Sequence, residues 1–362
     1  MKKLIALLLF VSFAPHAMAQ TADWKKSWEE TLAAARKEGK VVVSGPPSPE
    51  LRQTLPSAFK QRYGITLEYL AGRGSETATK LRTEHQAGAM TVDVVIAGIQ
   101  TMATILYREK MLDPVRPALV LPEVTDGSKW KSGKLWFSDP DDQYVLRLSN
   151  TISPTFYINT SLIKPGEIRT AKDLLDPKWK GKIALQDPTV PGSGSNHAAQ
   201  LYIQLGEDFV KKLYIEQKPA ISRDTRQITD WLARGSYAIS LGGEDRQLDE
   251  LRKDGILIVP LNLSDTRQLL SAGFGELALL RGAPHPNAAK VFLNWMASKE
   301  AGEIFARALA TASTRNDVDE SFLSPEVIPQ TGKAYFDTYD WEFTVTTKEE
   351  IRLRLKELFG AL

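Results

Sequence analysis

The sequence predicts an α/β protein of two lobes, and three observations lead to this prediction. Strand-like and helix-like segments alternate over residues 24–111, and a second alternation of the same kind covers residues 171–260. Such alternation is typical of a mostly parallel sheet with helices on its faces. The chain has 362 residues, which is enough for two domains of ordinary size, each with its own hydrophobic core.

The elements of the first half follow from apolar periodicity and turn residues. A helix that runs through Leu32 stops at Gly39, and the apolar run at residues 41–43 forms the first strand. The pattern then predicts helices at residues 49–63, 75–87 and from residue 100 onward, with strands at 66–70 and 93–97. We expect these strands to form one sheet whose carboxyl ends face a ligand.

The second half predicts another lobe and a return to the first. An extended segment at residues 145–157 is interpreted as the crossover. The pattern beyond it predicts helices at 171–175, 195–205, 208–213 and 226–234, and strands at 182–185, 237–241 and 256–260. A strand at 271–280 and helices at 287–305 and 348–358 complete the chain. The expected division places residues 20–150 and 268–362 in lobe 1 and residues 151–267 in lobe 2.

The first nineteen residues have the composition of a secretory signal. Lys2 and Lys3 precede an apolar run at residues 4–13, and Ala17 and Ala19 form a small-residue cleavage pattern. The apolar run is about ten residues long, whereas a membrane-spanning helix needs about twenty. We therefore expect cleavage after Ala19 and a soluble periplasmic protein, with an uncleaved anchor as the alternative.

Charge and cysteine content exclude several classes of function. The chain has 46 Lys and Arg against 44 Asp and Glu, and removal of Lys2 and Lys3 with the signal makes the two equal. Nucleic-acid and membrane-surface binding need a basic excess, so we expect neither partner and no direct membrane insertion. The absence of cysteine excludes thiolate metal sites, cysteine nucleophiles and a lipid-modified cysteine. No cofactor is predicted.

Small residues follow the predicted strands of the first lobe. Ser44 and Gly45 follow the first strand, Arg73, Gly74 and Ser75 the second, and Gly98 the third. Small residues let a backbone approach a ligand, and each following helix offers unpaired N–H groups. The alternative is that these residues only punctuate the turns between strands and helices.

The second lobe carries the most specific candidate for anion binding. Asp187 ends a strand, and a Gly/Ser loop then leads through Ser193, Gly194 and Ser195 into a helix. Backbone N–H groups, two hydroxyls and the helix dipole suit a phosphate, phosphonate or carboxylate. The alternative is a flexible turn with Ser195 as the N-cap. The loop lacks the Lys-Ser/Thr ending of a nucleotide-binding P-loop.

Three arginines are candidates for the opposing positive charge. Arg223 and Arg226 flank Asp224, and an ordinary solvated helix start is the alternative for this pair. Arg73 is better placed because it follows a predicted strand between glycines. The planar guanidinium donates two parallel hydrogen bonds to a carboxylate or phosphate, which favours arginine over lysine.

Four segments give the chain a resemblance to a known family. They read DLLDPKWKGKI at residues 173–183, GAPHPNAA at 282–289, SKEAG at 298–302 and STRNDV at 313–318. The chain resembles periplasmic solute-binding proteins of ABC importers, in the branch related to ferric-ion-binding proteins. The resemblance implies a type II fold of two lobes joined by two extended crossovers. It also implies a ligand in the cleft, lobe closure on binding, a permease partner in the inner membrane and a monomer.

The resemblance does not extend to the iron ligands of the ferric-ion branch. Those proteins carry adjacent tyrosines after the strand that here spans residues 237–241, and this chain continues with Gly242, Gly243, Glu244 and Asp245. Glu244 and Asp245 could offer oxygen ligands to a hard cation, so a ferric-ion site is kept as an alternative. We predict no metal site and favour a small polar, anionic organic solute.

Two further classes of function stay open. A periplasmic enzyme could use the same scaffold, because a fold does not fix a function, although no strand–Gly-x-Ser-x-Gly–helix elbow is present. The second class is a sensor subunit, which would deliver its closed form to a receptor kinase. We expect a binding protein without enzymatic activity.

Overall fold

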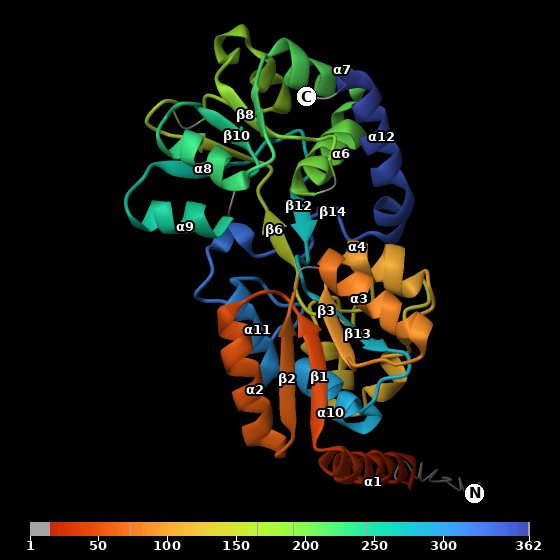
Figure 1. Ribbon diagram of the computed structural model, residues 1–362. Coiled ribbons are helices and arrows are strands. Elements are labelled where there is room, and N and C mark those ends of the chain that lie inside the picture. Colours follow the sequence, from red (N-terminus) through yellow and green to blue (C-terminus); the bar gives the residue numbers. More distant parts are fainter. Residues whose placement is uncertain (1–14, 73, 165, 191, 244, 361–362) are drawn as a thin grey trace, which may run out of the picture.

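The computed structural model consists of two lobes, one above the other in Figure 1, with extended strands between them. It describes residues 15–72, 74–164, 166–190, 192–243 and 245–360. The predicted two-lobed α/β fold is confirmed.

The sheet of the first lobe has the strand order β2-β1-β3-β13-β4, with β5 also paired to β13. Its strands are β1 (Lys40–Gly45), β2 (Thr66–Ala71), β3 (Val94–Ala97), β4 (Leu112–Asp113), β5 (Leu146–Arg147) and β13 (Glu276–Leu280). β1 is parallel to β2 and β3, whereas β13 is antiparallel to β3, β4 and β5. β13 has this direction because the chain enters the sheet from the side of the other lobe.

Helices pack against this sheet, and aromatic side chains form part of the core of the lobe. They are α1 (Pro15–Glu38), α2 (Pro49–Tyr63), α3 (Gly74–Ala87), α4 (Ile99–Thr101) with the π-helical segment η1 (Met102–Tyr107), α5 (Pro122–Thr125), α10 (Pro286–Met296) and α11 (Lys299–Leu309). Phe59 of α2 lies 5.6 Å from Phe292 and 5.2 Å from Trp295 of α10, measured between ring centroids. All three side chains are buried, so this contact fixes α2 and α10 against each other.

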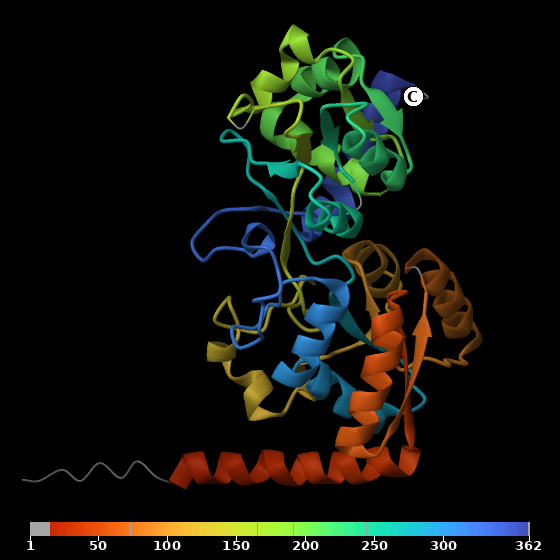
Figure 2. The ribbon, with the colours of Figure 1, turned by 90° about the vertical axis from the view of Figure 1, so that its left-hand side faces the viewer.

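The helix α1 extends beyond the first lobe, as Figure 2 shows. Its second half packs through Trp28, Leu32 and Ala35 on the core of that lobe. The predicted cleavage point after Ala19 lies within α1, and residues 1–14 lie outside the described part of the chain. Cleavage stays a prediction. Within the described ranges, none of the helices combines the length and apolar character that crossing a bilayer requires.

The second lobe has a five-stranded sheet in the order β11-β7-β10-β8-β9. Its strands are β7 (Phe156–Asn159), β8 (Ile183–Gln186), β9 (Ala220–Ser222), β10 (Ile239–Leu241) and β11 (Ile258–Leu261). β8 is parallel to β9 and β10, and β7 is antiparallel to β10 and β11. The helices are α6 (Ser193–Leu205), α7 (Glu207–Lys211) with the π-helical segment η6 (Lys212–Glu216), α8 (Thr225–Ala233) and α9 (Asp245–Lys253).

A small sheet joins the lobes. The crossover strands β6 (Thr151–Ser153) and β12 (Leu269–Ser271) are antiparallel, and β14 (Phe336–Asp337) is parallel to β12. Figure 1 shows β6, β12 and β14 side by side between the two lobes. The strands β6 and β12 are the two extended connections that the resemblance implies. The third strand, β14, comes from the C-terminal part of the chain.

The C-terminal segment packs differently from the expected division. We expected residues 268–362 to belong to lobe 1 throughout. In the structure α12 (Lys348–Phe359) covers α6, and Ile351 and Leu355 are buried in the core of the second lobe. The apolar stripe of α12 predicts that one face is buried, but it does not tell which lobe the helix covers. The other expected boundaries stay a prediction.

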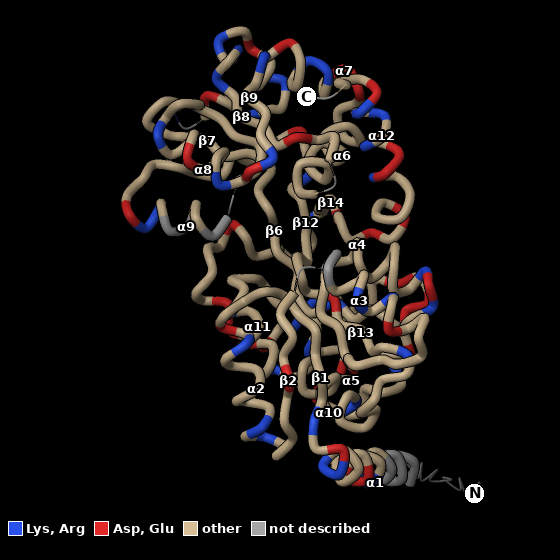
Figure 3. The backbone as a smooth tube through the Cα atoms, viewed as in Figure 1, with Lys and Arg blue, Asp and Glu red and all other residues tan. Residues whose placement is uncertain are grey.

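Charged side chains are spread over both lobes. Figure 3 shows Lys and Arg interspersed with Asp and Glu along the described backbone. Residues of both signs are thus distributed along both lobes, which agrees with the balanced composition.

Candidate functional site

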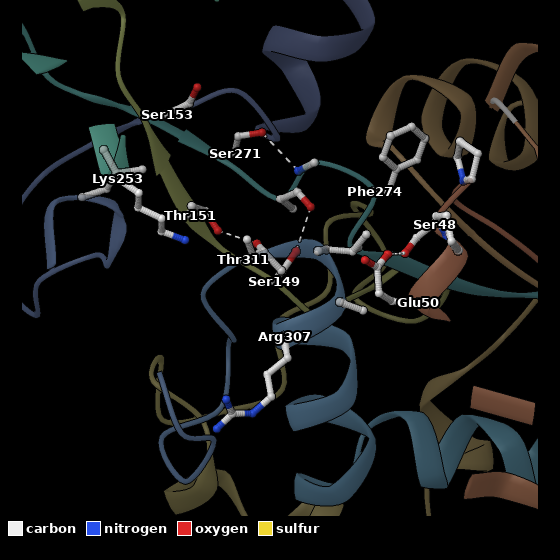
Figure 4. Close-up of a pocket in the computed structure, with 18 residues that line it drawn as sticks. Ser48, Glu50, Ser149, Thr151, Ser153, Lys253, Ser271, Phe274, Arg307 and Thr311 are labelled. Atoms are coloured by element: carbon white, nitrogen blue, oxygen red, sulfur yellow. Dashed lines mark hydrogen bonds between the residues drawn. The ribbon is translucent and has the colours of Figure 1, made fainter. Parts of the chain in front are cut away.

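A cavity of about 590 Å³ lies between the lobes. Residues of the β1–α2 loop, the two crossovers, the end of α11 and Lys253 of α9 line it, as Figure 4 shows. The polar lining residues are Ser48, Glu50, Ser149, Thr151, Ser153, Lys253, Ser271, Arg307 and Thr311. A concave site of this size between two lobes suits a small organic molecule.

The hydroxyl groups of the wall are held by their neighbours. The Ser48 hydroxyl accepts a hydrogen bond from the Leu51 amide at 3.3 Å, which caps α2, and donates to Glu50 at 3.2 Å. Ser149 donates to the Ala272 carbonyl at 2.8 Å, and Thr151 and Thr311 share a hydrogen bond. These contacts fix the wall before a ligand enters, which reduces the entropy cost of binding.

The cavity contains one cation without a partner in the described part of the chain. Lys253, at the end of α9, has neither an ion pair nor a hydrogen bond there. The guanidinium of Arg307, by contrast, pairs with Asp319 and lies 4.7 Å from the centroid of the Phe322 ring. In Figure 4 the Arg307 side chain extends away from the labelled hydroxyls. Lys253 is therefore the residue of the described cavity lining that is best placed to attract an anion.

The residues predicted in the first lobe lie at strand ends, as expected. The Ser44 hydroxyl lies 3.4 Å from that of Thr77 in α3. Gly45 lies under the Tyr69 ring, because a methyl group there would come within 2.4 Å of the Tyr69 oxygen. At Gly98 a methyl group would lie 3.1 Å from the carbonyl oxygen of Gly273, which lines the cavity. Close packing explains why both positions are occupied by glycine. Of the two, Gly98 is the one that lies against a residue of the cavity wall.

Three other predicted residues of the first lobe follow β2 in the sequence. Gly74 and Ser75 open α3, which agrees with the predicted strand-to-helix turn, but their surroundings are not described. Arg73 lies outside the described residues. Their roles in ligand binding stay predictions.

Asp187 of the second lobe holds Arg223. Asp187 is buried and accepts hydrogen bonds from the Thr189 amide at 2.8 Å, the Thr189 hydroxyl at 2.6 Å and Arg223 Nε at 2.8 Å. Burial opposes ionisation, but the hydrogen bonds from Thr189 and Arg223 outweigh it and lower the pKa of Asp187. Because Asp187 compensates its charge, Arg223 is a weaker candidate for an anion than the sequence predicts.

The Gly/Ser loop forms a tight turn at the start of α6. The Ser195 hydroxyl accepts a hydrogen bond from the Gly192 amide at 3.2 Å and donates to the Gly192 carbonyl at 2.9 Å. Gly192 occupies the N-cap, so Ser195 stabilises the first turn from within the helix. A methyl group at Gly194 would lie 2.5 Å from the Asp187 carbonyl oxygen, whereas Ser193 is exposed. The loop brings Asp187, Gly194 and Ser195 together, and its anion site stays a prediction.

The remaining predicted residues lie near helix starts. Arg226 is exposed in the first turn of α8, which Asp224 caps by accepting a hydrogen bond from the Arg226 amide at 2.9 Å. Asp245 opens α9, but its side chain is not described, and Glu244 lies outside the described residues. Within the ranges that the structure describes, no group of three or more His, Asp or Glu side chains could hold a metal ion.

Sequence reasoning missed the residues that line the cavity. Ser149, Thr151 and Ser153 alternate along the first crossover, and this period of two could have shown a polar strand face. Ser48 follows the predicted loop residues by three positions. No local signal distinguishes Lys253 from the other surface lysines.

Two α/β lobes joined by crossover strands around a polar cavity define a solute-binding protein that holds its ligand between the lobes. The family model for bacterial extracellular solute-binding proteins matches residues 19–303. The chain belongs to this family, which places it outside the cytoplasm and makes it the solute-binding component of an ABC importer.

Relatives agree with this membership. A Haemophilus influenzae protein of uncharacterised function is 27% identical over 292 residues, covering 75% of this chain and 76% of that protein. A Salmonella typhi periplasmic protein, provisionally named as 2-aminoethylphosphonate-binding, is 25% identical over 276 residues, or 73% of this chain and 74% of that protein.

Two solved structures show the same fold. The periplasmic binding protein AfuA of Actinobacillus pleuropneumoniae with bound fructose-6-phosphate has a TM-score of 0.64 at 18% identity, over 88% of this chain and 97% of AfuA. Iron-bound HitA of Pseudomonas aeruginosa has a TM-score of 0.62 at 16% identity, over 89% of this chain and 99% of HitA.

Proposed function

We propose that this chain captures a small anionic organic solute, a phosphonate, phosphate ester or carboxylate, in the interlobe cavity and delivers it to a membrane permease. The observation that carries the proposal is the Lys253 ammonium, which has no partner among the described residues, in a cavity lined by hydroxyl groups from the first lobe and the crossovers. A charge-assisted hydrogen bond to an ammonium is about twice as strong as a neutral one.

The composition of the wall supports capture by closure. Ser48 and Thr311 belong to the first lobe, Lys253 to the second, and Thr151 and Ser271 to the crossovers. A ligand that contacts both lobes stabilises the closed form more than the open form, and this difference is what drives closure. The protein acts in this account as a monomer that binds and releases its solute unchanged.

Two similarities support the class of solute. The Salmonella typhi relative is named for an aminophosphonate and AfuA holds a sugar phosphate, so both names point to phosphorus-containing anions. The iron-binding neighbour shares the fold, but this chain lacks the adjacent tyrosines that ferric-ion members of the family carry after the strand at residues 237–241. An organic anion is therefore the better candidate.

A thermal-shift and calorimetric screen tests the proposal. The protein is freed of bound solute by extensive dialysis and titrated with phosphonates, phosphate esters, dicarboxylates and ferric citrate. We expect at least one organic anion to raise the melting temperature, because a ligand that binds only the folded state stabilises it by mass action. Stabilisation by ferric citrate alone would contradict the proposal, and conversion of the solute during overnight incubation would favour an enzyme.

A further inference from the structure

The cavity contains charges of both signs. Arg307 of the first lobe pairs with Asp319, and the two other charged lining residues, Glu50 and Lys253, come from opposite lobes. Glu50 lies in the first turn of α2 in the first lobe, and Lys253 ends α9 in the second. Figure 4 shows the two side chains at opposite sides of the cavity, with the crossover hydroxyls between them. Glu50 is exposed, and an anion that reaches its end of the cavity would meet a carboxylate, where like charges repel each other.

An aromatic side chain lies on the same side of the cavity as Glu50. Phe274 lines the cavity with 38% of its surface exposed, although most phenylalanines of the described chain are buried. In Figure 4 Phe274 is drawn beside Ser48 and Glu50, away from Lys253. A carboxylate together with an exposed aromatic ring forms the environment that binds an organic cation, through an ion pair and a cation–π contact.

We infer that the solute is zwitterionic: its anionic group binds near Lys253 and its ammonium group binds Glu50, with Phe274 beside it. This inference rests on the proposed function and narrows its class of solute. Because each pole contacts a different lobe, the solute contributes attraction across the cleft on closure. Glu50 is then the residue that selects amino-substituted anions over plain ones.

The ordinary role of Glu50 can be separated from this one by a matched control. Acidic residues in a first helical turn interact favourably with the helix dipole, and Glu50 also accepts the Ser48 hydroxyl. The start of α11 likewise has a serine N-cap, Ser298, with an acidic residue, Glu300, two residues later, although the Ser298 hydroxyl donates to the Trp295 carbonyl at 2.7 Å. Glu300 does not line the interlobe cavity. Glu300→Gln therefore changes a helix start without changing the proposed site.

The test compares 2-aminoethylphosphonate with ethylphosphonate by isothermal titration calorimetry on the whole protein freed of solute. We expect the unmodified protein and Glu300→Gln to prefer the amino compound at least tenfold, the scale of a charge-assisted hydrogen bond. Glu50→Gln should lose this preference while binding ethylphosphonate as well as before or better. Lys253→Gln should weaken the binding of both compounds and leave the ratio of their dissociation constants unchanged.

Each of the following results would overturn the inference. Equal affinity of the unmodified protein for the two phosphonates would leave the proposed function intact and would contradict the inference that the solute is zwitterionic. A second such result is that Glu50→Gln lowers the affinity for both compounds equally, or that Glu300→Gln shows the same change in preference. Either outcome would mean that Glu50 only stabilises the start of α2. If neither phosphonate binds but another organic anion does, only the inference fails; if no organic anion binds, the proposed function fails with it.

Discussion

Glu276 is a buried acid at the junction of the first lobe and the crossovers. Its side chain accepts a hydrogen bond from Ser138 at 2.9 Å and lies opposite Arg147, which forms a two-pronged ion pair with Asp337 of β14. Burial raises the pKa of Glu276 to about 8, while Arg147 opposes the shift. Asp337 and Asp139 add to the increase. The folded protein therefore holds a proton on Glu276 at neutral pH.

This proton makes stability depend on pH. Between the ordinary pKa of a glutamate and about 8, the folded state binds the proton and the unfolded state loses it, so the free energy of unfolding falls as pH rises. The slope reaches at most about 1.4 kcal/mol per pH unit. We expect Glu276→Gln to remove this decline when urea unfolding is followed from pH 5 to pH 9. Parallel pH profiles for the two proteins would contradict the assignment.

At the scale of elements, α12 connects the lobes. Arg352 donates to the Thr189 carbonyl at 2.8 Å in the second lobe, while Lys348 donates to Gln100 in the first. The periodicity of α12 was sufficient to predict a helix at residues 348–358, but not its packing on α6. The partner of an amphipathic stripe depends on how the chain returns through β12 and β14, which no local pattern records.

The packing of α12 predicts a stability effect. Leu355 is fully buried in the core of the second lobe, so Leu355→Ala leaves a cavity there. We expect a loss of roughly 2–5 kcal/mol in the free energy of unfolding, measured by urea denaturation. Leu353 of the same helix is 48% exposed, and Leu353→Ala is the matched control with an effect near zero. Equal losses in the two variants would mean that α12 does not pack as described.

For the molecule as a whole, the sequence was sufficient to predict the lobes but not the cavity. The strand ends at Gly45 and Gly98 follow from local alternation, because a strand followed by a helix must turn there. The cavity, in contrast, combines Ser48, Thr151 and Lys253, which are about a hundred residues apart from one to the next. Only the three-dimensional arrangement of the lobes brings such residues together. Arg73 and Glu244 lie outside the described residues, so their predicted roles stay predictions.

Small-angle X-ray scattering with and without saturating solute tests the central claim most directly. A solute that bonds to both lobes should stabilise the closed form, so we expect the radius of gyration to decrease on addition of a solute identified by calorimetry. Lys253→Gln at the same total solute concentration should show a smaller decrease, because fewer molecules are bound. An unchanged radius of gyration at proven saturation would contradict the account of capture by closure.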